Sequence, residues 1–118
     1  MKRKVKLFLY DMIENMKMAE DLTSGIEYQT FIADKTRHYA VLRCIEIIGE
    51  ASKHITDEIR SANPLIPWKE MAGMRDKLIH DYFGVNLRTV WDTVKKDIPD
   101  LKPKFEQIYR DFAGKEAE

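Results

Sequence analysis

Apolar residues recur at intervals of three and four along most of the chain, and this spacing constrains the fold more than any other feature. In the segment 5–22 the apolar positions with this period are Leu7, Phe8, Met12, Met16 and Ala19. Such a period places the apolar side chains on one face of an α-helix. No run alternates apolar and polar residues for long enough to indicate a strand. The sequence therefore predicts an all-α fold.

The pattern predicts a bundle of four to five helices. The expected helices cover residues 5–22, residues 28 or 31 to 59, and residues 68–82, 87–94 and 99–112. The second is the most apolar, with a stripe of Val41, Cys44, Ile45, Ile48, Ala51, Ser52 and Ile55. A helix of this kind lies at the centre of a small bundle or lines an oligomer interface. Pro67 and Asn86 are suited to helix starts, and Gly84 is suited to a helix end.

Length and charge limit the possible classes of protein. With 118 residues, the chain is expected to form one domain over 1–113, followed by a polar tail, 114–118, that frays. Its 20 basic and 20 acidic residues exclude a strongly basic coat for nucleic acid but allow a local positive groove. The single cysteine, Cys44, excludes an internal disulfide and indicates a reducing, cytoplasmic location. No apolar run is long enough to span a membrane.

A cation, an imidazole and a phenol occur close together between Arg75 and Tyr82. Arg75 lies in an apolar stripe, and Tyr82, seven residues later, shares its helix face because seven steps turn the helix by about 700°. His80 lies about 140° away from Arg75, on the same face as Asp76. Arg75 and His80 can converge only if the arginine curls round, the helix deforms, or a second copy of the helix completes the site.

Structural interpretations of the same residues remain open. Arg75 in an apolar stripe also fits an ion pair with Glu46 or Glu50 on the long helix. His80 also fits a residue near a helix end, and Tyr82 an aromatic at the edge of the core. The three histidines and the single cysteine do not have the spacing of a metal site, and the acidic residues between positions 97 and 100 are interpreted as solvated charges near a helix end.

The order of several short blocks resembles the HepT family of HEPN-domain proteins. These blocks are Ile48-Gly49-Glu50-Ala51, Ile66-Pro67-Trp68, Gly73-Met74-Arg75, His80-Asp81-Tyr82-Phe83 and Ile98-Pro99-Asp100-Leu101. The resemblance extends over nearly the whole chain. It implies an all-α homodimer in which the arginine–histidine motifs of two subunits line a shared cleft.

The resemblance also implies an activity and a partner. HepT-like proteins resemble metal-independent ribonucleases and are toxins of toxin–antitoxin pairs, silenced when a minimal nucleotidyltransferase transfers AMP to the motif tyrosine. By position, Arg75 and His80 would be catalytic and Tyr82 would be the modified residue. Asp76 departs from the polar amide that often follows the motif arginine; its carboxylate could orient His80 and would also repel the phosphate backbone. No cofactor or metal is implied.

The chemistry of these residues is consistent with RNA cleavage. Attack by a 2′-hydroxyl group requires a base, an acid for the leaving 5′-oxygen, and a cation for the charge that develops on the phosphate. Two His80 side chains could supply the base and the acid, and Arg75 the cation. Two alternatives are a non-catalytic nucleotide-binding subunit that positions a nucleotidyltransferase, and a purely structural dimer.

Overall fold

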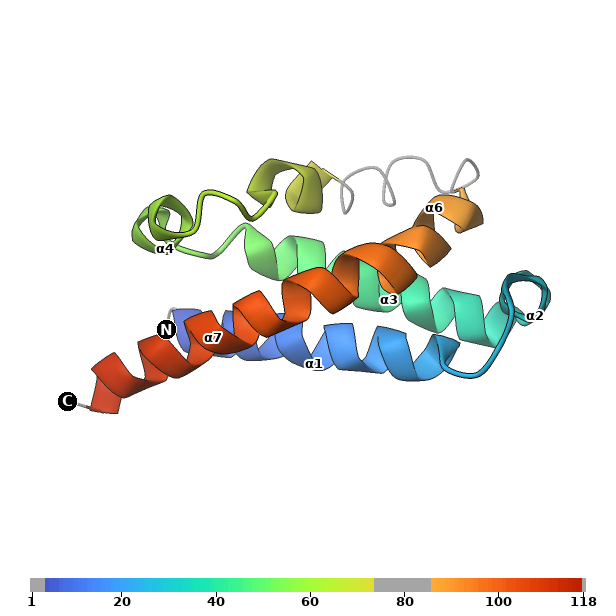
Figure 1. Cartoon of the computed structure of the whole chain (residues 1–118), viewed down its shortest axis with the longest axis horizontal. Coiled ribbons are helices and arrows are strands. Elements are labelled where there is room, and N and C mark those ends of the chain that lie inside the picture. Colours follow the sequence, from blue (N-terminus) through green and yellow to red (C-terminus); the bar gives the residue numbers. More distant parts are fainter. Residues whose placement is uncertain (1–3, 74–85, 118) are drawn as a thin grey trace.

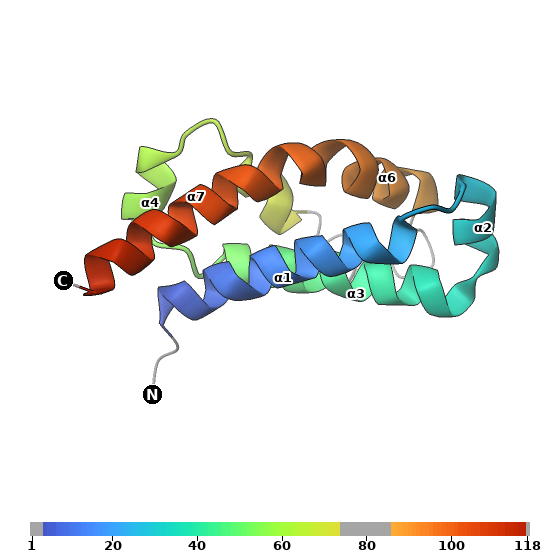
Figure 2. The same ribbon diagram turned by 60° about the horizontal axis from the view of Figure 1, so that its bottom comes forward.

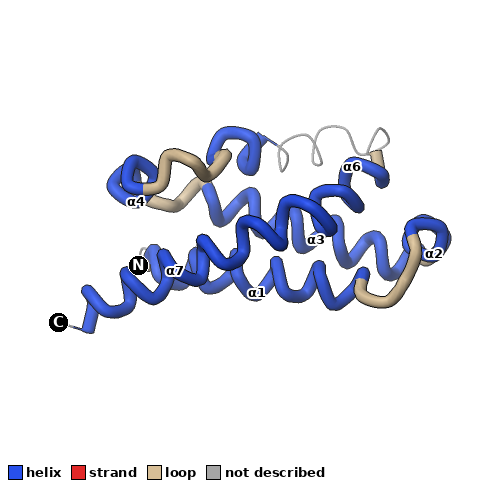
Figure 3. Tube along the Cα trace, in the orientation of Figure 1, coloured by secondary structure: helices blue, strands red, loops and turns tan. Residues whose placement is uncertain are grey.

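Three long helices lie side by side and form the body of the protein (Figures 1 and 2). The computed structural model describes residues 4–73 and 86–117, with the side chains of residues 4–73 and 86–112. The helices are α1 (Val5–Thr23), α2 (Tyr28–Ala33), α3 (Lys35–Ser52), α4 (Asp57–Ala62), α6 (Leu87–Asp92), the π-helical turn η2 (Thr93–Asp97) and α7 (Ile98–Ala117). Residues 68–73 are also helical. These ranges contain no strand (Figure 3), so the all-α prediction is confirmed.

Helix α1 packs against both α3 and α7 and supplies much of the core. Its completely buried apolar side chains are Leu9, Met12, Met16 and Ala19. The predicted bounds are confirmed, but the prediction that Leu7 faces the core is wrong: Leu7 is 44% exposed, and Leu9 occupies the core. After Thr23 the chain leaves the helix through Gly25, whose φ of 72° is a left-handed conformation suited to glycine.

The single helix expected up to residue 59 is instead three helices, so this prediction is wrong. Asp34 ends α2 and caps α3 by accepting a hydrogen bond from the Arg37 backbone N–H at 3.0 Å. This hydrogen bond lowers the pKa of the Asp34 carboxyl group below its ordinary value. Thr56 likewise caps α4 by accepting from the backbone N–H of Ile59. The apolar period continues across both caps. The helix nevertheless breaks there, because the cap side chains accept hydrogen bonds from backbone N–H groups at the start of the next helix.

The apolar stripe predicted for the long helix is confirmed on α3 and the turn that follows it. Its members Val41, Cys44, Ile45, Ile48, Ala51, Ser52 and Ile55 are all buried. Burial also raises the pKa of the Cys44 thiol. This stripe belongs to the hydrophobic core, where α3 packs against α1.

Helices α6, η2 and α7 follow one another without a break, although the sequence predicts two separate helices. Asn86 caps the start as expected, and its side chain accepts from the backbone N–H groups of Arg88 at 2.9 Å and Thr89 at 3.2 Å. Pro99 lies in the first turn of α7, directly after η2. A proline lacks the N–H and crowds the carbonyl four residues earlier, which a wider turn accommodates. Helix α7 includes residues 114–117 of the tail.

Two lysines connect the C-terminal helices to α1. Lys102 of α7 donates to Glu20 at 2.5 Å, and this hydrogen bond raises the pKa of Lys102. Lys95 of η2 donates to the backbone carbonyl of Thr23 at 2.7 Å. Among the described residues, no helix is long and apolar enough to cross a membrane.

Candidate active site

The residues predicted for the active site, Arg75, Asp76, His80 and Tyr82, lie outside the described residues. The structure describes the chain up to Gly73 and again from Asn86. The described surroundings of the predicted motif are its two flanks and the helices that pack against them.

The flank before the motif is anchored by Trp68. Its indole N–H donates to the backbone carbonyl of Asn63 at 3.0 Å, and its ring meets Phe105 of α7 edge to face, with ring centroids 5.4 Å apart. The guanidinium of Arg60 lies 5.6 Å from the centre of the Trp68 ring. The helical segment that leads toward Arg75 therefore starts from a tryptophan held between α4 and α7.

Pro67 directly precedes the helical residues 68–73, at the helix start that the sequence predicts. The backbone N–H of Met71 donates to the Pro67 carbonyl at 3.0 Å, which is the first bond of the helical ladder. Proline suits this position because the first N–H groups of a helix have no partner within it. Ile66, just before it, is 4% exposed and fixes the connector to the core.

The flank after the motif is anchored by Trp91 of α6. Its ring centre lies 5.2 Å from that of Phe31 and 5.9 Å from that of Tyr28. Lys95 lies 4.9 Å above the same ring. Together with the Asn86 cap, these contacts fix the direction in which the chain enters α6. Both ends of the segment that contains the predicted site are thus held by aromatic side chains.

The two carboxylates proposed as alternative partners of Arg75 have contacts on or next to their own helix. Glu46 accepts from the Arg43 guanidinium at 2.8 Å. Glu50 lies 3.7 Å from the imidazole of His54, which stacks on the ring of Phe8. The ion pair suggested for Arg75 itself falls outside the described residues. Within the described ranges, no three His, Cys, Asp or Glu side chains are grouped so that they could hold a metal ion.

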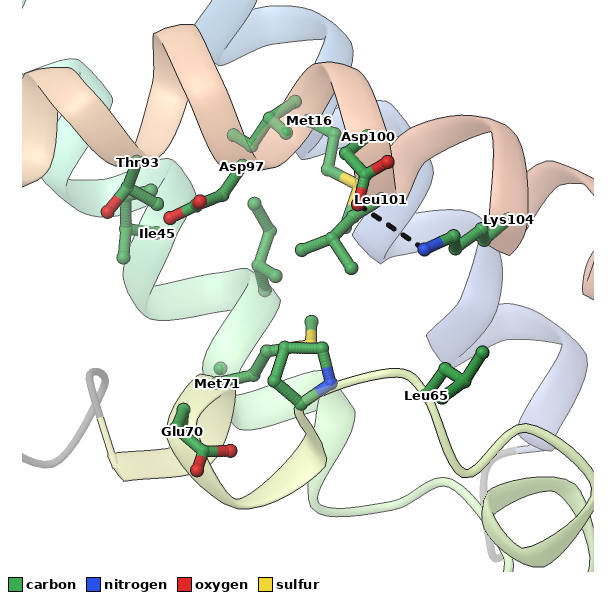
Figure 4. Close-up of a pocket in the computed structure, with 14 residues that line it drawn as sticks. Met16, Ile45, Leu65, Glu70, Met71, Thr93, Asp97, Asp100, Leu101 and Lys104 are labelled. Carbon is green, nitrogen blue, oxygen red and sulfur yellow. Dashed lines mark hydrogen bonds and ion pairs between the residues drawn. The ribbon is translucent and has the colours of Figure 1, made fainter.

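A pocket of about 330 Å³ opens beside the flank that precedes the motif (Figure 4). It lies between α3, the segment 65–71, and the η2–α7 helix. Its polar lining residues are Glu70, Thr93, Asp97, Asp100 and Lys104. From the sequence alone, the acidic residues between positions 97 and 100 are expected only to be solvated charges. The pocket has no sequence signal of its own, because four separate segments line it, including Met16 of α1.

Comparison with known proteins identifies the family. Residues 12–108 match the family described as "Ribonuclease HepT-like". A candidate RNase of Methanocaldococcus jannaschii, MJ1216, is 53% identical over 98% of this chain and 95% of its own length. The protein named "Probable ribonuclease HepT" from Thermococcus cleftensis is 52% identical over 92% of this chain and 98% of its own length. No solved structure matches the chain. With a family match that spans both flanks and the motif between them, the chain belongs to the HepT-like ribonuclease family.

Proposed function

We propose that this HepT-like ribonuclease is the toxin of a toxin–antitoxin pair and cleaves RNA without a metal ion. The observation that carries the proposal is the family match over residues 12–108, which includes Arg75 and His80. The anchored flanks support it, because a catalytic motif requires a rigid frame on both sides. In the described residues, Trp68 and Trp91 provide that frame.

In the proposed reaction the 2′-hydroxyl group of the RNA attacks the adjacent phosphorus. One His80 takes the hydroxyl proton, and a second His80 donates a proton to the 5′-oxygen as its bond to phosphorus breaks. Arg75 stabilises the negative charge on the phosphate oxygens, and Asp76 orients His80. The products are a 2′,3′-cyclic phosphate and a free 5′-hydroxyl group.

The proposed site is formed by two copies of the chain. On an ideal helix Arg75 and His80 face directions about 140° apart, so one helix does not bring both groups to the same phosphate directly. A two-fold axis beside the motif supplies the missing groups from the second copy and brings two histidines together. This arrangement also provides the separate acid and base that the reaction requires.

The test is cleavage of a fluorescently labelled single-stranded RNA in excess EDTA. We expect cleavage to persist and the upstream fragments to end in a 2′,3′-cyclic phosphate. The same RNA carrying 2′-O-methyl groups is the control and stays intact, because it lacks the nucleophile. Cleavage only after addition of a divalent cation, or no cleavage of any RNA by the wild-type dimer, would overturn the proposal.

Regulation by AMP transfer is a second part of the proposal. A nucleotidyltransferase antitoxin would place AMP on Tyr82, next to Arg75, where its bulk and charge exclude RNA. After co-expression with a nucleotidyltransferase encoded by the adjacent gene, intact-mass analysis should show added AMP that is absent from Tyr82→Phe. Tyr39→Phe is the matched control, since Tyr39 is 52% exposed and lies on α3. This variant should still receive AMP on Tyr82. An unchanged mass of the wild-type chain would contradict this part.

The main alternative is a non-catalytic subunit that binds a nucleotide and positions a nucleotidyltransferase. The match to a ribonuclease family favours the nuclease over this scaffold. The cleavage assay separates the two, because the scaffold leaves RNA intact.

A further inference from the structure

The pocket beside the motif has mostly apolar walls. Ile45 and Ile48 of α3 form one part of the wall, and Pro67, Met71 and Leu101 contribute others. In Figure 4, Met71 and Leu101 lie on different sides of the opening. A volume of about 330 Å³ lies within the range of small-molecule sites and exceeds the volume of one side chain. Walls of this kind can contact both faces of a planar ring.

The charged groups at the pocket are mainly acceptors of hydrogen bonds. Glu70, Asp97 and Asp100 contribute three carboxylates against the single ammonium group of Lys104, a formal charge of −2 (three negative, one positive). Lys104 donates to Asp100 at 3.3 Å and occupies that carboxylate. Two of the lining carboxylates, Glu70 and Asp97, form no hydrogen bond or ion pair with other described residues. The pocket therefore repels phosphate but can accept hydrogen bonds from an uncharged donor.

The π-helical turn places Asp97 at this opening. Thr93 and Asp97, the first and last residues of η2, both line the pocket, and Figure 4 shows them beside Ile45. The wider turn shifts the register of the side chains that follow it relative to a continuous α-helix. π-Turns within helices occur frequently at functional sites. The change in helix type thus coincides with a carboxylate that is available for a ligand, and unlike Glu70 this one lies on the helix that contains the π-turn.

The pocket is close to the proposed catalytic motif along the chain. Met71 lines the pocket and precedes Arg75 by four residues, which span at most about 14 Å even when fully extended. This short separation along the chain is compatible with an RNA that places a base in the pocket and the adjacent phosphate at the motif. The negative charge of the pocket keeps the phosphate itself outside.

We propose that the pocket binds a guanine base next to the cleaved bond, with the Asp97 carboxylate as the group that selects it; this inference rests on the ribonuclease function proposed above. Guanine presents two neighbouring donors on its Watson–Crick edge, N1–H and the 2-amino group, and one carboxylate can accept from both. Adenine, cytosine and uracil each place an acceptor beside their donor on this edge. That acceptor faces a carboxylate oxygen unfavourably.

Binding of free nucleosides tests the pocket directly. Guanosine, inosine, adenosine, cytidine and uridine are titrated separately into protein with ¹³C-labelled isoleucine and methionine methyl groups. We expect guanosine to shift the signals of Ile45, Ile48 and Met71 saturably. Inosine lacks the 2-amino group, and it and the other nucleosides should bind at least about tenfold more weakly, since hydrogen bonds to charged groups are worth more than one decade in affinity.

Asp97→Asn isolates the selecting carboxylate. It preserves the shape but replaces one acceptor by a donor, so guanosine affinity should fall about tenfold. Asp92→Asn is the matched control on the same continuous helix. Asp92 pairs with Arg88 at 3.5 Å and Lys96 at 3.9 Å and does not line the pocket. The Asp92→Asn variant should therefore bind guanosine with the wild-type affinity. Unchanged methyl spectra of the two free variants verify that both are folded.

RNA cleavage provides the second measurement. Wild-type protein should cut preferentially beside guanosine, and Asp97→Asn should retain cleavage but lose this preference. Equal binding of all five nucleosides, absence of saturable shifts with guanosine, or an unchanged affinity in Asp97→Asn would overturn the inference. Saturable shifts of the same methyl signals with the peptide acetyl-Leu-Arg-amide, but not with guanosine, would also overturn the inference. That result would assign the pocket to a protein partner.

The two levels of proposal fail differently. Guanosine binding without any RNA cleavage supports the pocket and contradicts the nuclease. Cleavage without base preference and without guanosine binding supports the nuclease and contradicts the pocket.

Discussion

Replacement of His80 by alanine should slow RNA cleavage by about 10²–10⁴-fold, because the proposed reaction then lacks its general acid and base. Arg75→Ala should slow it by about 10²–10³-fold through loss of charge stabilisation in the transition state. Both effects should appear in the rate of the chemical step, measured in single-turnover reactions with labelled RNA and saturating protein. The affinity for RNA should change much less than this rate, since the proposed roles concern groups that form or lose charge during the reaction.

A histidine elsewhere on the bundle supplies the control for this prediction. His54 stacks on Phe8 and lies near Glu50, and His54→Ala should cleave RNA within about twofold of the wild-type rate. Excess folded His80→Ala protein should also inhibit the wild-type chain, because mixed dimers of the proposed assembly would contain only one of the two histidines. A His80→Ala variant that keeps more than half of the wild-type rate would show that His80 is not the proton-transfer group.

The interior of the fold could be predicted from local spacing, but the ends of its helices could not. The stripe from Val41 to Ile55 is visible in the sequence because an apolar residue recurs at each turn of the helix. The breaks at Asp34 and Thr56 depend on single side chains that accept hydrogen bonds from the backbone, while the apolar pattern continues past them. Leu7 shows the same limit: its position fits the stripe, but α1 turns Leu9 into the core.

The continuity of the last helices required tertiary information. Pro99 is compatible both with the start of a new helix and with the first turn after a π-helical segment. Contacts made by Lys95 and Lys102 with α1 hold η2 and α7 on a single path along the bundle. Each of these contacts joins residues more than 70 positions apart, so no local pattern contains them.

The candidate site also has one part that the sequence can predict and one part that it cannot. The motif predicted for it, from Arg75 to Tyr82, is proposed from the order of short blocks, because residue types and their spacing can be read in the sequence. The pocket could not be found, since Ile48, Met71 and Asp97 belong to three segments that meet only in the folded chain. A motif of neighbouring residues is therefore visible in the sequence, whereas a cavity between helices is not.

Phe105→Ala should reduce the free energy of unfolding by about 3–5 kcal/mol. Phe105 is completely buried, and its edge-to-face contact with Trp68 joins α7 to the segment that leads into the motif. Loss of the ring removes apolar burial, leaves a cavity and breaks the aromatic pair. A domain of this size is stable by about 5–15 kcal/mol, so the change consumes a large part of the total. Urea unfolding should show a lower midpoint with an unchanged slope.

Leu65→Ala is the control, because Leu65 lies three residues before Trp68 but is 89% exposed. Its unfolding free energy should stay within about 0.5 kcal/mol of the wild-type value. Phe105→Leu keeps part of the buried volume and should fall between the two alanine variants. If Phe105→Ala and Leu65→Ala unfold at the same urea concentration, then Phe105 does not anchor Trp68, and the segment that leads into the motif is held in place by other contacts.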